Sequence, residues 1–158
     1  MANSKDEVKR LREETGAGVM DCKRALEEAK GDFDRAKSLI KERGLARAQK
    51  KAGREAKEGI VEAYIHGGGR IGALVELSSE TDFVARNDDF RELAREIAMQ
   101  VAAMDPQNVD ELLTQTYIRD ASKTVGELVT TLAATTGENV RVRRFARFQL
   151  GGSNGEAA

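Results

Sequence analysis

Cysteine and histidine are the scarcest reactive residues of this sequence, with one of each among 158 residues. A lone Cys22 cannot form an internal disulfide, and these counts cannot supply a thiolate zinc site within one chain. A catalytic pair of Cys22 and His66 remains formally open. We favour a packing role for Cys22, which lies in a helical pattern, and a surface position for His66, which adjoins a predicted hairpin turn. We expect no metal and no cofactor.

The sequence also lacks tryptophan, has a single proline, and contains no apolar run near the roughly 20 residues that cross a bilayer. Residues 1–6 lead directly into a charged helical pattern without an apolar signal region, so we expect a cytoplasmic protein that makes no membrane contact. Hydrophobic residues make up 40% and charged residues 34%, which is typical of a helix-rich folded protein rather than a disordered one.

The net charge of −1 conceals an uneven distribution. Residues 1–58 carry 16 basic and 12 acidic side chains, whereas residues 59–158 carry 10 and 15, which favours two domains. We interpret the basic, alanine-rich stretch from Lys41 to Lys57 as an exposed connecting helix. Nucleic-acid binding is the alternative, since each neutralised phosphate adds salt-dependent affinity, but no aromatic residue is interleaved for base stacking. The basic residues of this stretch that are concerned are Arg43, Arg47, Lys50, Lys51, Arg54 and Lys57.

Helical periodicity predicts three short helices within residues 1–44. Thr15 to Gly18 ends the first helix, Gly31 ends the second and Gly44 ends the third, which Asp32 caps. A unit of about 40 residues is only marginally stable alone, so we interpret it as a docking module. The Gly-x-Gly of the first break could form a phosphate cradle. We favour a turn, because the pair follows a helix rather than a strand and lacks the lysine and serine of a P-loop.

Alternating apolar residues then predict two strands, Gly59 to His66 and Arg70 to Ser78, joined by three glycines at 67–69. Three glycines suit a tight hairpin, because glycine accepts positive φ freely, whereas a phosphate loop would lead into a helix. A helix from Phe90 to Met104, capped by the preceding Asn87 or Asp88, should cover one face of the sheet.

After Asp105 and Pro106 the chain is predicted to be a loop, followed by a helix from Ser122 to Thr136 that ends at Gly137. A final strand runs from Asn139 to Leu150. One face of this strand is predicted to carry Val140, Val142, Ala146 and Phe148, and the other Arg141, Arg143, Phe145 and Arg147. The arginine face could bind phosphate, although we favour a solvated or subunit-pairing strand.

The segment Glu80 to Ala85 places Asp82 beside Phe83 where a loop is expected between rigid elements. An exposed acid and aromatic ring in this position suit insertion into another protein. The residues also permit a different interpretation, in which Ser79 and Asp82 form a helix-capping box and Phe83 turns into the core. The pattern alone leaves both open.

Three segments of this sequence resemble the signature segments of bacterial translation elongation factor Ts, in the order in which that family has them. They are Leu11 to Leu26, Glu80 to Asn87 and Gly137 to Phe145. The resemblance extends from about Val8 to Leu150. It implies an α+β fold with an N-terminal three-helix UBA-like domain, a connecting helix, and a small antiparallel sheet packed with helices.

We therefore expect a UBA-like domain at 1–44, a basic connecting helix at 45–58, an α+β core domain of the dimerisation type at 59–150, and a disordered tail at 151–158. By the resemblance, the chain is a guanine-nucleotide exchange factor for elongation factor Tu and has no enzyme active site. It binds the GDP-bound or nucleotide-free partner, disturbs its magnesium site, and promotes GDP release and GTP uptake. No direct nucleic-acid binding is expected.

The resemblance also implies two partner-binding surfaces. Residues Thr81, Asp82, Phe83 and Val84 match the segment that enters the partner near its magnesium ion. Leu11, Val19 and Met20 match the apolar patch by which the N-terminal domain grips a helix of the partner, although Leu11 could instead pack internally.

This sequence departs from longer family members, which have a second core subdomain and a coiled coil. Here only the brief segment from Asp105 to Leu113 separates the predicted helix that ends at Met104 from the closing segments of the core. Short members replace the missing surface by dimerising, so we expect a non-covalent homodimer that uses the strand from Val140 to Leu150, where Ala146 offers no cysteine. An adaptor that uses only the three-helix module, and a nucleic-acid-binding protein that uses the two basic segments, remain the alternatives.

Overall fold

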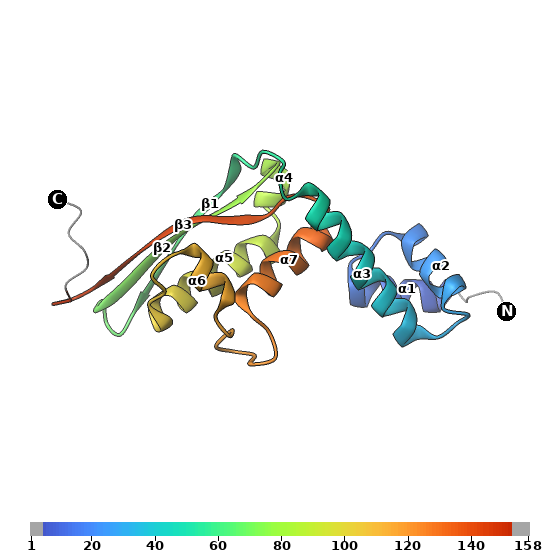
Figure 1. Ribbon diagram of the computed structural model, residues 1–158, viewed down its shortest axis with the longest axis horizontal. Helices are drawn as coiled ribbons and strands as arrows, with labels where there is room; N and C mark the ends of the chain where they lie inside the picture. The colour runs from blue at the N-terminus through green and yellow to red at the C-terminus, as the bar shows by residue number, and fades with distance from the viewer. Residues whose placement is uncertain (1–4, 153–158) are drawn as a thin grey trace.

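The computed structural model describes residues 5–152 and shows an elongated molecule, with three helices at one end and a helix-covered sheet at the other (Figure 1). Residues 153–158 of the predicted disordered tail lie outside the described residues. The predicted α+β fold is confirmed. The helices are α1 (Lys5–Thr15), α2 (Val19–Glu28), α3 (Phe33–Lys51), α4 (Asp82–Ala85), α5 (Asp88–Met104), α6 (Val109–Thr114) and α7 (Val125–Thr136). The strands are β1 (Glu58–His66), β2 (Ile71–Ser79) and β3 (Arg141–Gln149).

The N-terminal helices end where local chemistry predicts. Gly16 and Gly31 adopt positive φ at the ends of α1 and α2, and the Asp32 carboxylate caps α3 by accepting a hydrogen bond from the Arg35 amide at 2.9 Å. The three helices bury a small core of their own. Its buried members are Leu11, Cys22, Ala25, Leu26, Ala29, Ala36 and Leu39.

The prediction that Gly44 ends the third helix is wrong, because α3 continues without interruption to Lys51. Gly44 lies instead where α3 crosses α7, and a Cβ at this position would stand 3.0 Å from the Cβ of Ala134. The glycine therefore allows two helices to approach closely, which is a tertiary requirement rather than a stop signal. The first part of the predicted connecting helix is thus continuous with α3.

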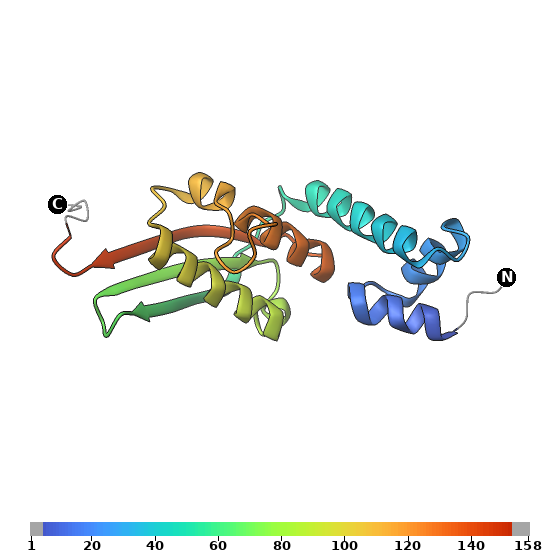
Figure 2. The same ribbon diagram turned by 90° about the horizontal axis from the view of Figure 1, so that it is seen from below.

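The sheet has the order β1-β2-β3, with both pairs antiparallel. The predicted hairpin is confirmed: Gly67, Gly68 and Gly69 all have positive φ in the turn between β1 and β2. Helices α5, α6 and α7 lie on one side of the sheet, and no helix among the described residues covers the other side (Figure 1 and Figure 2). The Asn87 side chain caps α5, and Gly137 ends α7 in the left-handed conformation.

The main core forms between α5 and the helix-facing side of the sheet. The prediction that the helix from Phe90 to Met104 covers one face of the sheet is confirmed: Phe90, Ile97 and Val101 of α5 are buried in one cluster with Val75 and Leu77 of β2. Met104, in the last turn of the helix, is 48% exposed and lies outside this core.

The region after Pro106, predicted as a loop, contains the short helix α6. The Asn108 side chain caps it by accepting a hydrogen bond from the Glu111 amide at 2.8 Å. An asparagine three residues before a glutamate is a known capping pattern, which the loop prediction overlooked. With 6 residues, α6 is too short to show a helical spacing of apolar residues in the sequence.

The predicted faces of the last strand are wrong beyond Val142, because β3 contains a bulge. Leu77 pairs with Val142, whereas the preceding Glu76 pairs with Arg144, so Arg143 is an extra residue. One inserted residue reverses the alternation of every side chain that follows it. Phe145 consequently packs against the core, and Phe148 is 67% exposed on the uncovered side.

Gly59 offers a direct test of the sheet geometry. It has φ +142°, and a Cβ there would lie 2.1 Å from the Leu77 carbonyl oxygen. We expect Gly59→Ala to lower the free energy of unfolding by about 2 kcal/mol or more, because backbone strain and the clash add. Gly53→Ala is the matched control: no atom lies within 4 Å of its added Cβ. Urea denaturation of both variants checks this, and equal stabilities would contradict it.

Candidate functional site

The segment predicted to probe a partner forms a short helical turn at the end of β2, at the end of the sheet nearest α3 (Figure 1). Its cap is Thr81, whose hydroxyl oxygen accepts a hydrogen bond from the Val84 amide at 3.4 Å. Phe83 is 82% exposed, while Val84 and Ala85 are buried beneath it. The alternative with Ser79 as the cap and Phe83 in the core is therefore wrong.

Asp82 lies beside the exposed ring and forms an ion pair with Arg86, with 3.0 Å between Oδ2 and Nη2. Both side chains are more than half exposed. Exposed ion pairs of this kind contribute at most about 1 kcal/mol, so the carboxylate can exchange this partner for another at little cost. Thr81, Asp82 and Phe83 thus share one exposed surface. Val84 belongs to the packing below it.

Glu138, which the sequence analysis did not single out, holds this turn from below. One of its carboxylate oxygens accepts hydrogen bonds from the Glu80 amide at 3.0 Å and the Thr81 amide at 2.9 Å, and the other accepts from the Thr81 hydroxyl. It lies in the signature segment Gly137 to Phe145, directly after Gly137, which ends α7 with a positive φ, but neither signal shows what its carboxylate contacts. Sequence separation of 57 residues hides such a contact from local patterns.

The N-terminal surface differs from the prediction at one residue. Val19 and Met20 are 50% and 56% exposed on the first turn of α2, but Leu11 is fully buried. Leu11 packs with Cys22 and Leu26 because it is the inward residue of α1. Its inclusion in an exposed patch is corrected: Leu11 supports the surface from within. The structure does not join this surface to the Phe83 turn, since α2 and α4 lie in different parts of the molecule (Figure 1).

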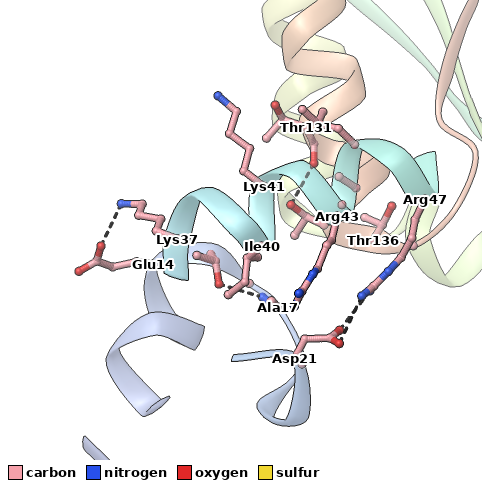
Figure 3. A pocket seen from close by; sticks show the side chains of 18 of the residues that line it. Glu14, Ala17, Asp21, Lys37, Ile40, Lys41, Arg43, Arg47, Thr131 and Thr136 are labelled. Carbon is pink, nitrogen blue, oxygen red and sulfur yellow. Dashed lines mark hydrogen bonds and ion pairs between the residues drawn. The ribbon is translucent and has the colours of Figure 1, made fainter. Parts of the chain in front are cut away.

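A groove of about 480 Å³ lies between the N-terminal helices and α7, apart from the Phe83 turn (Figure 3). Two of its cations form ion pairs: Lys37 lies 2.9 Å from Glu14, and Arg47 lies 3.1 Å from Asp21. The Arg47 guanidinium holds the pKa of the Asp21 carboxyl below its ordinary value. These ion pairs attach α3 to α1 and α2.

The basic residues predicted as a possible nucleic-acid surface are largely engaged within the protein. Ion pairs join Arg43 to Glu28 and Arg54 to Glu80, and the Lys51 amine donates to the Gly137 carbonyl oxygen. In β3, the bulge separates the predicted arginine face, and Arg143 and Arg144 both pair with Glu76. Each of these arginines stands beside a carboxylate, so the surface is less positive than the number of its basic residues suggests.

Cys22 and His66 are not brought together. Cys22 is buried among the N-terminal helices, where burial raises the pKa of its thiol. His66 is exposed at the hairpin end, with 2.9 Å between its Nδ1 and the Tyr64 hydroxyl oxygen. Within residues 5–152, no group of three histidine, cysteine, aspartate or glutamate side chains could hold a metal ion. In the same range, no helix is both long and apolar enough to cross a membrane.

Comparison with known proteins shows one consistent similarity. A family model described as Elongation factor TS matches residues 80–156. Elongation factor Ts of Carboxydothermus hydrogenoformans is 47% identical over 189 residues, which cover 91% of this chain and 87% of that protein. Elongation factor Ts of Thermotoga maritima is 44% identical over 194 residues, which cover 96% of this chain and 98% of that protein.

The alignment with the Thermotoga maritima protein is longer than this whole chain of 158 residues. That relative therefore has an internal stretch with no counterpart here.

The corrected position of Leu11 leads to a test that separates packing from surface contact. We expect Leu11→Ala to lower the free energy of unfolding of the N-terminal helices by about 2–5 kcal/mol, the usual cost of emptying a buried leucine site. Met20→Ala, on the exposed surface, should change it by less than about 0.5 kcal/mol. Amide hydrogen exchange in α1 and α2 measures both. Equal protection in the two variants would show that Leu11 is not a core residue.

Proposed function

Because this chain belongs to the elongation factor Ts family and so has a role in translation elongation, we propose that it is a guanine-nucleotide exchange factor for elongation factor Tu. The observation that carries this proposal is the 82% exposed Phe83 beside Asp82 on a braced turn. No catalytic residue and no cofactor is part of the proposal. The chain acts by binding alone.

Exposure of Phe83 is unfavourable in the free protein, since burying a phenylalanine side chain stabilises by roughly 1.5–3 kcal/mol. The turn beneath it is already ordered by Thr81, Glu138 and the buried Val84. A partner that accepts the ring therefore gains this free energy without the cost of ordering a loop. Such a rigid projection suits insertion into another folded protein.

In the proposed mechanism, Phe83 enters between apolar side chains of the nucleotide domain and shifts the elements that hold its magnesium ion. Asp82 competes for some of the polar contacts of those elements. The displaced ion no longer screens the charge of the diphosphate, and GDP is released. GTP then enters by mass action.

The exchange cycle follows from linkage. If the factor weakens nucleotide binding by some ratio, nucleotide weakens factor binding by the same ratio, and each tenfold corresponds to about 1.4 kcal/mol. Incoming GTP consequently displaces the factor. Neither ligand stays trapped on the partner.

A second contact comes from Val19 and Met20, the exposed apolar pair at the start of α2. In this proposal they grip a helix of the partner's nucleotide domain, while buried Leu11 fixes the helix that presents them. Two separated surfaces on one rigid molecule bind more tightly than either alone, because the second contact forms within the complex.

We also propose a non-covalent homodimer formed through the uncovered side of the sheet. Its exposed apolar residues are Val61 and Ile65 of β1, Leu74 of β2 and Phe148 of β3. β3 is an edge strand of the sheet, and its exposed aromatic residue Phe148 lies on this uncovered face. We therefore propose that the face, rather than the edge of β3, forms the dimer contact. A second copy is the occupant, because a two-fold axis would bring each apolar face against its equal.

The exchange proposal is tested by release of a fluorescent GDP analogue from elongation factor Tu. We expect acceleration by the wild-type chain and a loss of about thirtyfold or more in the double variant Asp82→Ala, Phe83→Ala, the usual effect of removing a central aromatic anchor. Ile118→Ala, another exposed apolar side chain at 42%, is the control and should behave as wild type. No acceleration by the wild-type chain would contradict the function and favour the adaptor interpretation.

The homodimer is tested by light scattering at micromolar concentration. We expect about twice the chain mass of 17.3 kDa for wild type and the monomer mass for Ile65→Asp, because a carboxylate on the apolar face must be desolvated in the contact. Ile118→Asp, outside this face, should leave the dimer intact. A monomeric wild-type protein would contradict the proposal.

A further inference from the structure

Two glutamates exchange backbone contacts at the base of the Phe83 turn. The Glu138 carboxylate accepts from the amides of Glu80 and Thr81, as described above. In return, the Glu80 carboxylate accepts from the Asn139 amide at 2.8 Å. We call this group, Glu80, Glu138 and Asn139, the junction clasp.

The clasp reaches a third segment through Asn139, which is 5% exposed. Its side-chain amide donates to the Ala52 carbonyl oxygen at 3.2 Å and to the Arg54 carbonyl oxygen at 2.7 Å. Arg54 itself forms an ion pair with Glu80 at 3.7 Å. The clasp therefore joins the end of β2, the connection from α7 to β3, and the chain that leaves α3.

These hydrogen bonds are suited to positioning the Phe83 turn rather than to stabilising the fold as a whole. The hydrophobic core lies below the turn, and the cap of α4 is supplied by Thr81. What Glu138 adds is orientation: its carboxylate receives both amides that precede the turn and the hydroxyl that caps it. Hydrogen bonds to a charged acceptor are about twice as strong as neutral ones and are directional, so they restrict rotation of the turn.

We propose that Glu138 is a positioning residue for nucleotide exchange. It holds Phe83 and Asp82 at a fixed angle to the sheet, and through Asn139 and the chain after α3 it keeps the turn in register with the Val19–Met20 surface. This inference rests on the proposed exchange function. It goes beyond that function by assigning a role to residues that do not contact the partner.

The expected result is a loss of acceleration of GDP release in Glu138→Ala of roughly tenfold, because a turn that samples several orientations is binding-competent for only part of the time. Glu92→Ala, an exposed glutamate of α5, is the matched control and should behave as wild type. Glu138→Gln retains an oxygen that can accept from both amides, so its loss should be smaller than that of the alanine variant.

A double-mutant cycle separates positioning from a general loss of stability. If Glu138 acts through Phe83, adding Glu138→Ala to Phe83→Ala causes little further loss, whereas independent effects multiply. Amide exchange gives a second readout: in Glu138→Ala, protection should fall at Glu80 and Thr81 and persist in α5. If the alanine variant unfolds, the same cycle is run with Glu138→Gln.

The outcomes distinguish the two proposals. No acceleration by the wild-type chain would overturn the exchange function, and the positioning role with it. Normal acceleration in wild type together with multiplicative effects in the cycle, unchanged acceleration in Glu138→Ala, or an equal loss in the glutamine and alanine variants would overturn the positioning role alone.

Discussion

The arrangement of the whole molecule depends on the crossing of α3 over α7. The N-terminal helices have only a small core of their own. Their placement relative to the sheet is therefore set by the contacts that α3 makes outside this core. At the crossing, Gly44 faces Ala134, and a Cβ on Gly16 would stand 2.8 Å from a methyl of Thr135. Larger residues at either glycine would separate the two parts. Close packing at two points thus sets the N-terminal helices against the helix-covered sheet.

Local patterns predicted most of the helices and the hairpin, because their signals lie within a few residues of one another. The caps Asp32 and Asn87 and the glycine turn at 67–69 are examples. The local pattern left the exposed and the buried position of Phe83 both open, and the family resemblance favoured the exposed one that the structure shows. The faces of β3 were misassigned beyond Val142, because the bulge at Arg143 shifts the alternation of its side chains by one residue.

The remaining errors share one physical cause, which is that a residue's role was set by a distant contact. Gly44 was interpreted as a stop because glycine often ends helices, yet its neighbour is Ala134, 90 positions away. Leu11 was placed on a surface by resemblance, although it is the inward residue of α1. Glu138 was noted only as part of a signature segment, without a role, because a single glutamate after a helix is usually solvated. The role of each of these residues could be assigned only once the structure showed which distant segments it contacts.

The two proposed partner surfaces have different energetic tasks. A contact that is equally favourable in the GDP-bound and nucleotide-free partner raises affinity but cannot drive release, because only a difference between the states shifts an equilibrium. The Val19 and Met20 surface, on a separate part of the molecule, suits the first task. In the proposed mechanism the Phe83 turn suits the second, because its insertion displaces the magnesium site. The packing of α3 on α7 connects the two surfaces, so affinity gained at one can drive distortion at the other, whereas a flexible linker would allow the first contact without the second.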